Sequence, residues 1–181
     1  MELETTRFGT IKIDPESVIT FTQPILGFQE YRRFVMLPGP CEYLTWLQST
    51  DAGDLAFILL DPHSVVPDYA VNMRPQELAE LAVSSVEELH VYTLVVVPND
   101  HSQIRTNLKA PILISSKHRL GKQTILERSD YPIQYFLAQA AREDARQASA
   151  GPQTSAGPQA SAGPETAAGQ PQEVSNARAD A

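Results

Sequence analysis

The strongest constraint on the fold is a series of short β-prone segments, each closed by proline, glycine or aspartate. Five of them lie in the first third of the chain, at residues 10–13, 18–21, 33–37, 45–49 and 56–60. Each has about five residues, and this spacing is typical of a β-sandwich or a small β-barrel. The last of the five is apolar throughout, which predicts a central strand that is buried on both faces.

Later segments extend this β pattern and add two helices. Residues 91–97 are the most β-prone stretch of the chain, and we expect this strand to pair with the run after Ile104. A shorter strand is predicted at residues 69–73. Proline at a first helical position and apolar residues at helical spacing predict short helices at residues 75–84 and 133–147.

A basic hairpin is predicted in the second half of the chain. Residues 111–114 and 124–126 are β-prone and flank a polar connector, residues 115–121, that ends in glycine. This pattern predicts antiparallel pairing. The stretch from 105 to 128 contains a single acidic residue, Glu127. Its basic residues are Arg105, Lys109, Lys117, Arg119, Lys122 and Arg128.

The end of the chain has a different composition. A six-residue Ser-Ala-Gly-Pro pattern is repeated with small changes over residues 149–166, and it contains no large apolar side chain. Such a segment cannot bury enough apolar surface to offset the entropy of an ordered chain. The sequence therefore predicts a mostly β, barrel-like domain over residues 1–147 and a disordered tail over residues 148–181.

Charge is unevenly distributed along the 181 residues, whose formal net charge is -8. Residues 1–104 hold 15 Asp/Glu and 5 Lys/Arg, whereas residues 105–146 hold 4 Asp/Glu and 8 Lys/Arg. An acidic majority opposes direct nucleic-acid binding and suits a basic protein partner. Ordinary solubility charge would give a similar composition.

The sequence also indicates the cellular compartment in which we expect the protein. Cys41 is the only cysteine, so an intrachain disulfide is excluded and a reducing environment is the simpler expectation. The acidic N-terminus lacks the apolar region of a secretory signal. The longest apolar run, residues 91–97, is much shorter than the roughly 20 residues that span a bilayer. We expect a cytoplasmic protein that does not enter a membrane.

Candidate catalytic and metal-binding patterns are incomplete. Gly121-Lys122 lacks both the earlier glycine and the following Ser or Thr of a phosphate-binding loop. The four histidines have no metal-ligand spacing. Asp61 and His63 could form a dyad, but there is no Gly-x-Ser-x-Gly turn for it to activate. Cys41 is followed by Glu42, whose charge opposes thiolate formation. The sequence therefore predicts neither an enzyme nor a cofactor site.

Several blocks of residues resemble the flagellar assembly factor FliW family. The resemblance covers about residues 1–140 and preserves the order of the blocks, of which the Asn-Leu-Lys-Ala-Pro and Leu-Gly-Lys-Gln pair is the most specific. The blocks are Pro24-Ile25-Leu26-Gly27-Phe28, Trp46-Leu47-Gln48-Ser49, Leu55-Ala56-Phe57, Asp61-Pro62, Pro67-Asp68-Tyr69, Asn107-Leu108-Lys109-Ala110-Pro111 and Arg119-Leu120-Gly121-Lys122-Gln123. One departure is Leu26, where many members have proline before Gly-Phe; its loss would relax that turn.

The resemblance implies a compact, mostly antiparallel β-barrel-like domain without enzymatic activity or a cofactor, monomeric when free. Members bind CsrA, which represses translation of flagellin mRNA, and they also bind flagellin. Free flagellin occupies the factor and leaves CsrA active, and flagellin secretion frees the factor to antagonise CsrA. The antagonism is allosteric, so RNA and the factor must weaken each other's binding to CsrA by equal factors.

Six residues are candidates for partner contacts. We place the predicted strand at residues 67–73 on the CsrA-binding surface, although an ordinary edge strand would have the same composition. Aromatic residues beside acids are expected to add apolar contacts. At the entrance to the basic hairpin a structural role is favoured over contact, because Asn shapes turns. The candidates are Phe57, Asp68, Tyr69, Val71, Asn107 and Lys109.

Two other function classes remain open at this stage. A closed β-barrel of this size could hold one small ligand, which would require a large apolar cavity. The basic hairpin at residues 105–128 could instead track RNA phosphates, although it lacks the aromatic residues on which bases stack. Lysines that protect an exposed strand edge would give the same pattern. A hydrolase ranks last.

Overall fold

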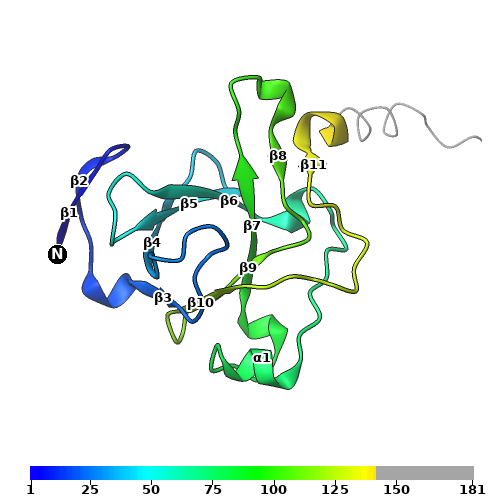
Figure 1. Ribbon diagram of the computed structural model, residues 1–181, viewed down its shortest axis with the longest axis horizontal. Coiled ribbons are helices and arrows are strands. Elements are labelled where there is room, and N and C mark those ends of the chain that lie inside the picture. Colours follow the sequence, from blue (N-terminus) through cyan, green and yellow to red (C-terminus); the bar gives the residue numbers. More distant parts are fainter. Residues whose placement is uncertain (142–181) are drawn as a thin grey trace, which may run out of the picture. The chain divides into compact units, whose positions relative to one another are not determined.

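The computed structural model describes residues 1–141, and most of its strands lie where the punctuated β-prone runs predict them (Figure 1). The strands are β1 (Glu2–Thr5), β2 (Gly9–Lys12), β3 (Ile19–Phe21), β4 (Arg33–Pro38), β5 (Leu44–Ser49), β6 (Ala56–Leu60), β7 (His90–Val96), β8 (Arg105–Thr106), β9 (Ile112–Ser115), β10 (Leu120–Gln123) and β11 (Tyr135–Phe136). The helix α1 spans Pro75–Ala79, and residues 137–141 are also helical. Short 3-10 turns occupy Pro15–Ser17 (η1), Pro62–Ser64 (η2), Val86–Glu88 (η3) and His101–Gln103 (η4).

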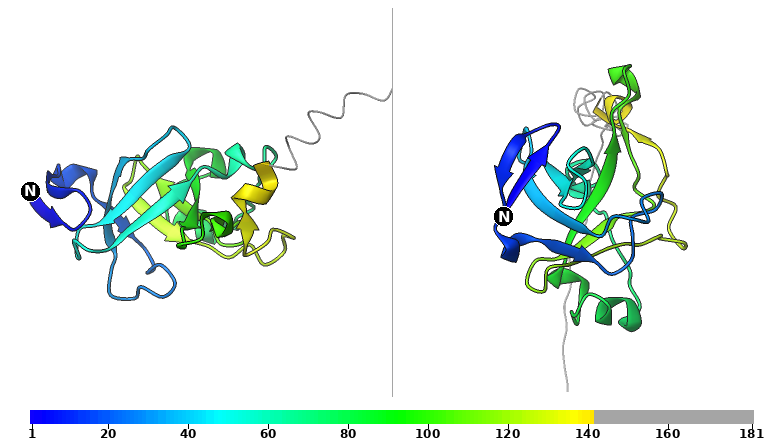
Figure 2. Two further views of the ribbon diagram at one scale, coloured as in Figure 1. Left: turned by 90° about the horizontal axis from the view of Figure 1, so that it is seen from above. Right: turned by 60° about the vertical axis from the view of Figure 1, so that its left-hand side comes forward.

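The long strand β7 closes a seven-stranded barrel. The strands follow the order β7-β6-β5-β4-β3-β10-β9, and β9 pairs back onto β7. The first half of β7 (His90, Val91, Tyr92) pairs with β9, while Val95 and Val96 pair with β8. All pairs are antiparallel except β3 with β10. The predicted barrel-like architecture and the pairing of β7 with the run after Ile104 are therefore confirmed (Figures 1 and 2).

Large apolar side chains fill the barrel interior. Phe21 and Phe34 pack edge to face with ring centroids 5.1 Å apart, and both are fully buried. Leu47, Leu59 and Ile112 are also fully buried around them. Burying each side chain of this size contributes about 1.5–3 kcal/mol. The interior is thus a packed core, and the large apolar cavity that a small-ligand barrel requires is occupied by these side chains.

The predicted basic hairpin exists, but its second strand begins earlier than expected. β9 and β10 pair through a tight turn at residues 116–119, in which Arg119 has a φ of 53°. Regular pairing ends at Gln123, so residues 124–126 are not a strand. Their backbone still follows β9, because the N–H groups of Thr124 and Leu126 donate to the carbonyls of Pro111 and Lys109.

Two other sequence-based expectations are wrong, and one strand was not predicted. Residues 69–73 have strand composition but pair with no strand of the described region. The second helix begins at residue 137, because residues 135–136 pair with β8 as the short edge strand β11. β1 was not among the predicted strands, and it pairs with β2 over its full length. Predictions beyond residue 141, including the repeat tail, lie outside the described residues.

The β1–β2 hairpin lies beside the strands β4–β6 (Figure 2). Its connecting turn contacts Trp46 of β5. The N–H of Thr6 donates to the carbonyl of Gly53, 3.0 Å away, in the β5–β6 turn. The Phe8 ring meets Trp46 edge-on at 5.5 Å, and the guanidinium of Arg7 lies 4.5 Å from the centre of the indole ring. This cation–π contact helps to fix the hairpin on the outer face of the barrel.

Candidate functional site

A groove with a volume of about 530 Å³ lies beside β10. Three segments that are distant in the sequence line it: residues 23–26 after β3, residues 70–77 between η2 and α1, and residues 122–129 at and after β10. In Figure 1 the second segment descends on the right-hand side into α1, and the third runs across the picture from β10 toward the right. Three of the sequence blocks singled out above lie in the groove or donate hydrogen bonds to its walls, so we treat it as the candidate site.

A tight turn at residues 25–28 forms one wall. The N–H of Phe28 donates to the carbonyl of Ile25 at 2.8 Å, and Gly27 has a φ of 89°, as in a type II turn. Leu26 occupies the position of this turn where proline is favoured. Its N–H donates to Oε1 of Gln123 at 3.0 Å, a bond that proline could not make. The departure at Leu26 therefore replaces a rigid ring with a hydrogen bond to β10.

Gln123 and Asn107 tie the groove to the hairpin entrance. Nε2 of Gln123 donates to the carbonyl of Ala110 at 3.2 Å. Oδ1 of Asn107 accepts from the N–H groups of Lys109 (3.0 Å) and Ala110 (3.1 Å), which confirms that Asn107 shapes this turn. The Lys109 ammonium donates to the carbonyl of Ser129 on the groove wall. Partner contact by Asn107 or Lys109 stays a prediction.

The charges that line the groove are largely paired within the chain. Lys122 is only 6% exposed, and its Nζ lies 2.8 Å from Oε2 of Glu80, just beyond α1. Nε of Arg74 lies 3.2 Å from Oε2 of Glu77. Hydrogen bonds from the backbone N–H and the guanidinium of Arg74 lower the pKa of Glu77. These pairs lie at the two ends of α1, and they leave the groove without a cluster of like charges.

Tyr69 was predicted to contact CsrA, but its side chain lies in the core and not at the surface. The side chain is 5% exposed and stacks on Tyr131 with ring centroids 4.5 Å apart. Its hydroxyl donates to the carbonyl of Leu108 at 2.7 Å, and burial raises the pKa of the phenol. Val71 is half-buried and packs toward the same interior. Asp68 remains exposed and is available to a partner.

Phe57 lies apart from the other candidates. It is half-buried on β6, where its ring meets Phe28 edge-on at 4.8 Å and Phe34 at 6.0 Å. The structure therefore brings Asn107, Lys109 and the segment after Asp68 toward the groove, but places Phe57 at the margin of the core. Its contact with a partner stays a prediction.

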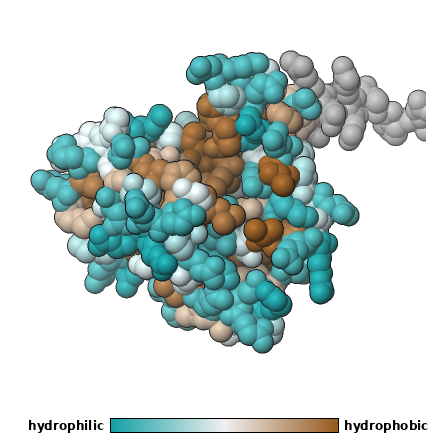
Figure 3. Space-filling view, in the orientation of Figure 1, coloured by the Kyte–Doolittle hydropathy of each residue, from teal (hydrophilic) through white to brown (hydrophobic). Residues whose placement is uncertain are grey.

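Sequence reasoning missed the exposed large apolar residues of the groove. Leu26 is 59% exposed and Ile125 is 54% exposed, although both are large and apolar. Leu26 had been noted only as a departure from the turn pattern, and Ile125 had been assigned to a strand. On the face shown in Figure 3, a second area of apolar surface gathers over the end of β7, where Val96 and Val97 are exposed.

Comparison with known proteins identifies the family of this chain. A family model described as FliW protein matches residues 2–137. The chain belongs to the FliW family. FliW relatives described as flagellar assembly factors include one from Geobacter sulfurreducens, which is 36% identical over 146 residues, covering 80% of this chain and 92% of the relative. Another, from Caldanaerobacter subterraneus subsp. tengcongensis, is 37% identical over 137 residues, covering 75% and 91%.

A solved structure supports the same assignment. The crystal structure of a flagellar assembly factor FliW superposes with a TM-score of 0.70 at 30% identity, covering 75% of this chain and 96% of that one. The FliW fold thus accounts for nearly all of the described region. The resemblance inferred from the sequence blocks is confirmed.

The basic residues of this FliW chain are mostly engaged within the molecule. Lys109 and Lys122 make the contacts described above, Nη1 of Arg119 donates to the carbonyl of Glu16 at 2.7 Å, and Nη1 of Arg105 donates to the carbonyl of Gln103 at 3.2 Å. Four of the six basic residues at 105–128 therefore have intramolecular acceptors. This use of the charges weakens the argument for a phosphate-tracking surface.

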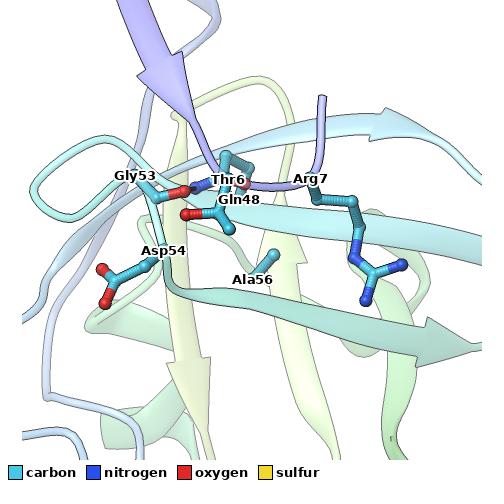
Figure 4. A pocket seen from close by; sticks show the side chains of 6 residues that line it. All are labelled: Thr6, Arg7, Gln48, Gly53, Asp54 and Ala56. Atoms are coloured by element: carbon cyan, nitrogen blue, oxygen red, sulfur yellow. Dashed lines mark hydrogen bonds between the residues drawn. The ribbon is translucent and has the colours of Figure 1, made fainter. Parts of the chain in front are cut away.

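A second cavity, of about 360 Å³, lies under the β1–β2 hairpin (Figure 4). Gln48 is fully buried between Arg7 and Asp54, and its Nε2 donates to the carbonyls of Ser49 and Leu55. Within residues 1–141, no group of three or more His, Cys, Asp or Glu side chains is placed to hold a metal ion. No helix of this region is long and apolar enough to span a bilayer.

Proposed function

We propose that this chain regulates flagellum assembly in the cytoplasm by binding other proteins, without catalysing a reaction. Its partners are the translational repressor CsrA and flagellin. Binding to CsrA relieves repression of flagellin mRNA, and free flagellin competes by occupying the chain. The observation that carries the proposal is membership of a family of flagellar assembly factors over residues 2–137.

The charge of the barrel supports a basic partner such as CsrA. The first 104 residues hold 15 acidic side chains and 5 basic ones, an imbalance that steers a basic protein toward the surface. Asp68 is exposed at a bend that leads into the groove, so we place it at the edge of the CsrA surface. The antagonism is allosteric on the CsrA side, and RNA and this chain weaken each other's binding equally.

A reconstituted translation assay tests the proposal. Translation of a flagellin-mRNA reporter is repressed with purified CsrA, and the full-length chain is then added. We expect translation to recover, and to fall again when flagellin is added in excess. A reporter that stays repressed at saturating amounts of the chain would contradict the proposal.

The charge reversal Asp68→Lys tests the surface. We expect weaker CsrA binding without loss of the fold, because Asp68 is exposed. Glu30→Lys is the matched control, since Glu30 is also exposed and the change in net charge is identical. Equal CsrA affinities for the two variants would remove Asp68 from the interface. Tyr69 is left unchanged, because its buried ring supports the fold.

A further inference from the structure

The segment between η2 and α1 has an unpaired backbone. Within the described part of the chain, the N–H and C=O groups of Val71, Asn72 and Met73 have no hydrogen-bond partner. The N–H of Ala70 donates to the hydroxyl of Tyr131 at 2.9 Å. Exposure alternates from residue 70 to residue 73, as in a strand with one face turned inward. Residues 70–73 are therefore strand-like in pattern and lack a neighbouring strand.

The same segment borders apolar side chains that have no cover within the described region. Ala70, Asn72 and Met73 line the groove together with Leu26 and Ile125, which are 59% and 54% exposed. A peptide that adds to an unpaired strand gains affinity from main-chain hydrogen bonds and selectivity from contacts at alternate side chains. The groove offers both features in one place.

The balanced charge of the groove indicates which kind of segment could bind there. Arg74, Lys122 and Arg128 are balanced by Glu77, Glu127 and the Glu80 that pairs with Lys122. This balance contrasts with the acidic excess of residues 1–104. A charge-balanced groove gives no electrostatic advantage to a basic segment, and it suits an uncharged one.

We propose that an uncharged, extended segment of flagellin binds in this groove as a strand added to residues 70–73, with alternate apolar side chains against Leu26 and Ile125. The inference rests on the proposed function, which supplies two partners. CsrA is the basic partner, and the acidic surface beyond the groove, where Asp68 is exposed, suits it. This assignment replaces the sequence-based placement of residues 70–73 on the CsrA surface. The charge-balanced groove is therefore assigned to flagellin.

Amide hydrogen exchange on the full chain tests this assignment. The amides of residues 71–73 should exchange rapidly in the free protein, because they lack acceptors. Flagellin at saturation should slow at least some of them by about tenfold or more, since only alternate N–H groups of a strand face one neighbour. CsrA at saturation should leave them unchanged. Protection by CsrA alone, or flagellin binding without any protection here, would overturn the proposal.

Substitutions in the groove provide an independent test. Leu26→Glu and Ile125→Glu place a charge on exposed positions, so the fold should persist while flagellin affinity falls by about tenfold or more. Val97→Glu is the control, because Val97 is similarly exposed but does not line the groove. Equal flagellin affinity for all three variants would overturn the assignment.

The remaining outcomes are also distinguishable. Self-association that Ile125→Glu abolishes would identify a second copy of the chain as the occupant and would overturn the flagellin assignment. If the unaltered chain binds neither flagellin nor CsrA, the proposed function fails and the groove assignment fails with it. If it binds flagellin with the groove unprotected, only the groove assignment fails.

Discussion

The barrel interior and the groove both contain large apolar residues, but these residues are buried in the interior and exposed in the groove. In the interior, Phe34 and Leu47 are fully enclosed, and the surrounding strands pair on both sides. In the groove, Leu26 and Ile125 are more than half exposed, and the backbone at residues 71–73 is unpaired within the described region. The difference separates two uses of apolar side chains. The interior stabilises the fold, whereas the groove leaves apolar surface and backbone hydrogen-bonding groups uncovered within the described region, and the proposed flagellin strand would cover them.

The largest expected effect is the loss of an interior side chain. Phe34→Ala should reduce the free energy of unfolding by about 3–5 kcal/mol, because it removes a fully buried ring and leaves a cavity. Ile125→Ala should change it by less than about 0.5 kcal/mol, because this residue is exposed. Chemical denaturation measures both. A similar decrease in the free energy of unfolding for the two variants would contradict the distinction between interior and groove.

Tyr69→Phe tests whether Tyr69 belongs to the interior, which stabilises the fold, or to the partner surface. It leaves the buried carbonyl of Leu108 without its hydroxyl donor, which should cost about 1–3 kcal/mol of stability. Affinity for CsrA and flagellin should be unchanged, because the ring is buried. Denaturation and titration of the same sample measure these quantities. Weaker binding with unchanged stability would return Tyr69 to the partner surface.

The pH dependence of stability tests an ion pair at the rim of the barrel. Burial acts to raise the pKa of Asp51, but hydrogen bonds from the side chain and N–H of Arg33 and from the N–H of Arg32 outweigh it and lower the pKa. The folded carboxylate therefore adds stability above the unfolded pKa of about 3.9, and this is lost as pH falls further. Melting temperatures at neutral and acidic pH should differ less for Asp51→Asn than for the unaltered chain.

The smallest expected effect is at the groove turn. Leu26→Pro should stabilise the turn by about 0.4–1 kcal/mol through a less flexible unfolded chain, but it loses the hydrogen bond to Gln123. The two effects oppose each other, so the net change should be small. In a Gln123→Ala background only the favourable effect remains, and the substitution should be more stabilising there. Equal changes in the two backgrounds would show that the bond contributes nothing.

The proline, glycine and aspartate residues that end the β-prone segments predicted the strands well, because they affect the backbone conformation of only a few neighbouring residues. This pattern identified residues 56–60 as β6 without error. It could not predict that β9 pairs back onto β7, or that β3 pairs with β10, since those contacts join distant segments. Residues 69–73 illustrate the difference. Their composition favours a strand, and their alternating exposure fits one, but no described strand lies beside them to pair with.

The candidate site was only partly predictable for the same reason. The role of Asn107 follows from turn chemistry between neighbouring residues and was predicted correctly. Tyr69 is buried by packing against Leu108 and Tyr131, and its hydroxyl donates to the carbonyl of Leu108, which is 39 residues away. Leu26 and Ile125 meet across one groove only because β10 pairs with β3. Neither the burial of Tyr69 nor the pairing that brings Leu26 and Ile125 to one groove has a local signal in the sequence.

Calorimetric titration of the purified full-length chain, with flagellin in one cell and CsrA in another, tests the central claim most directly. The proposed function predicts saturable binding of each protein, and a reduced heat of CsrA binding when flagellin is already present. A folded sample that produces no binding heat with either protein would contradict it.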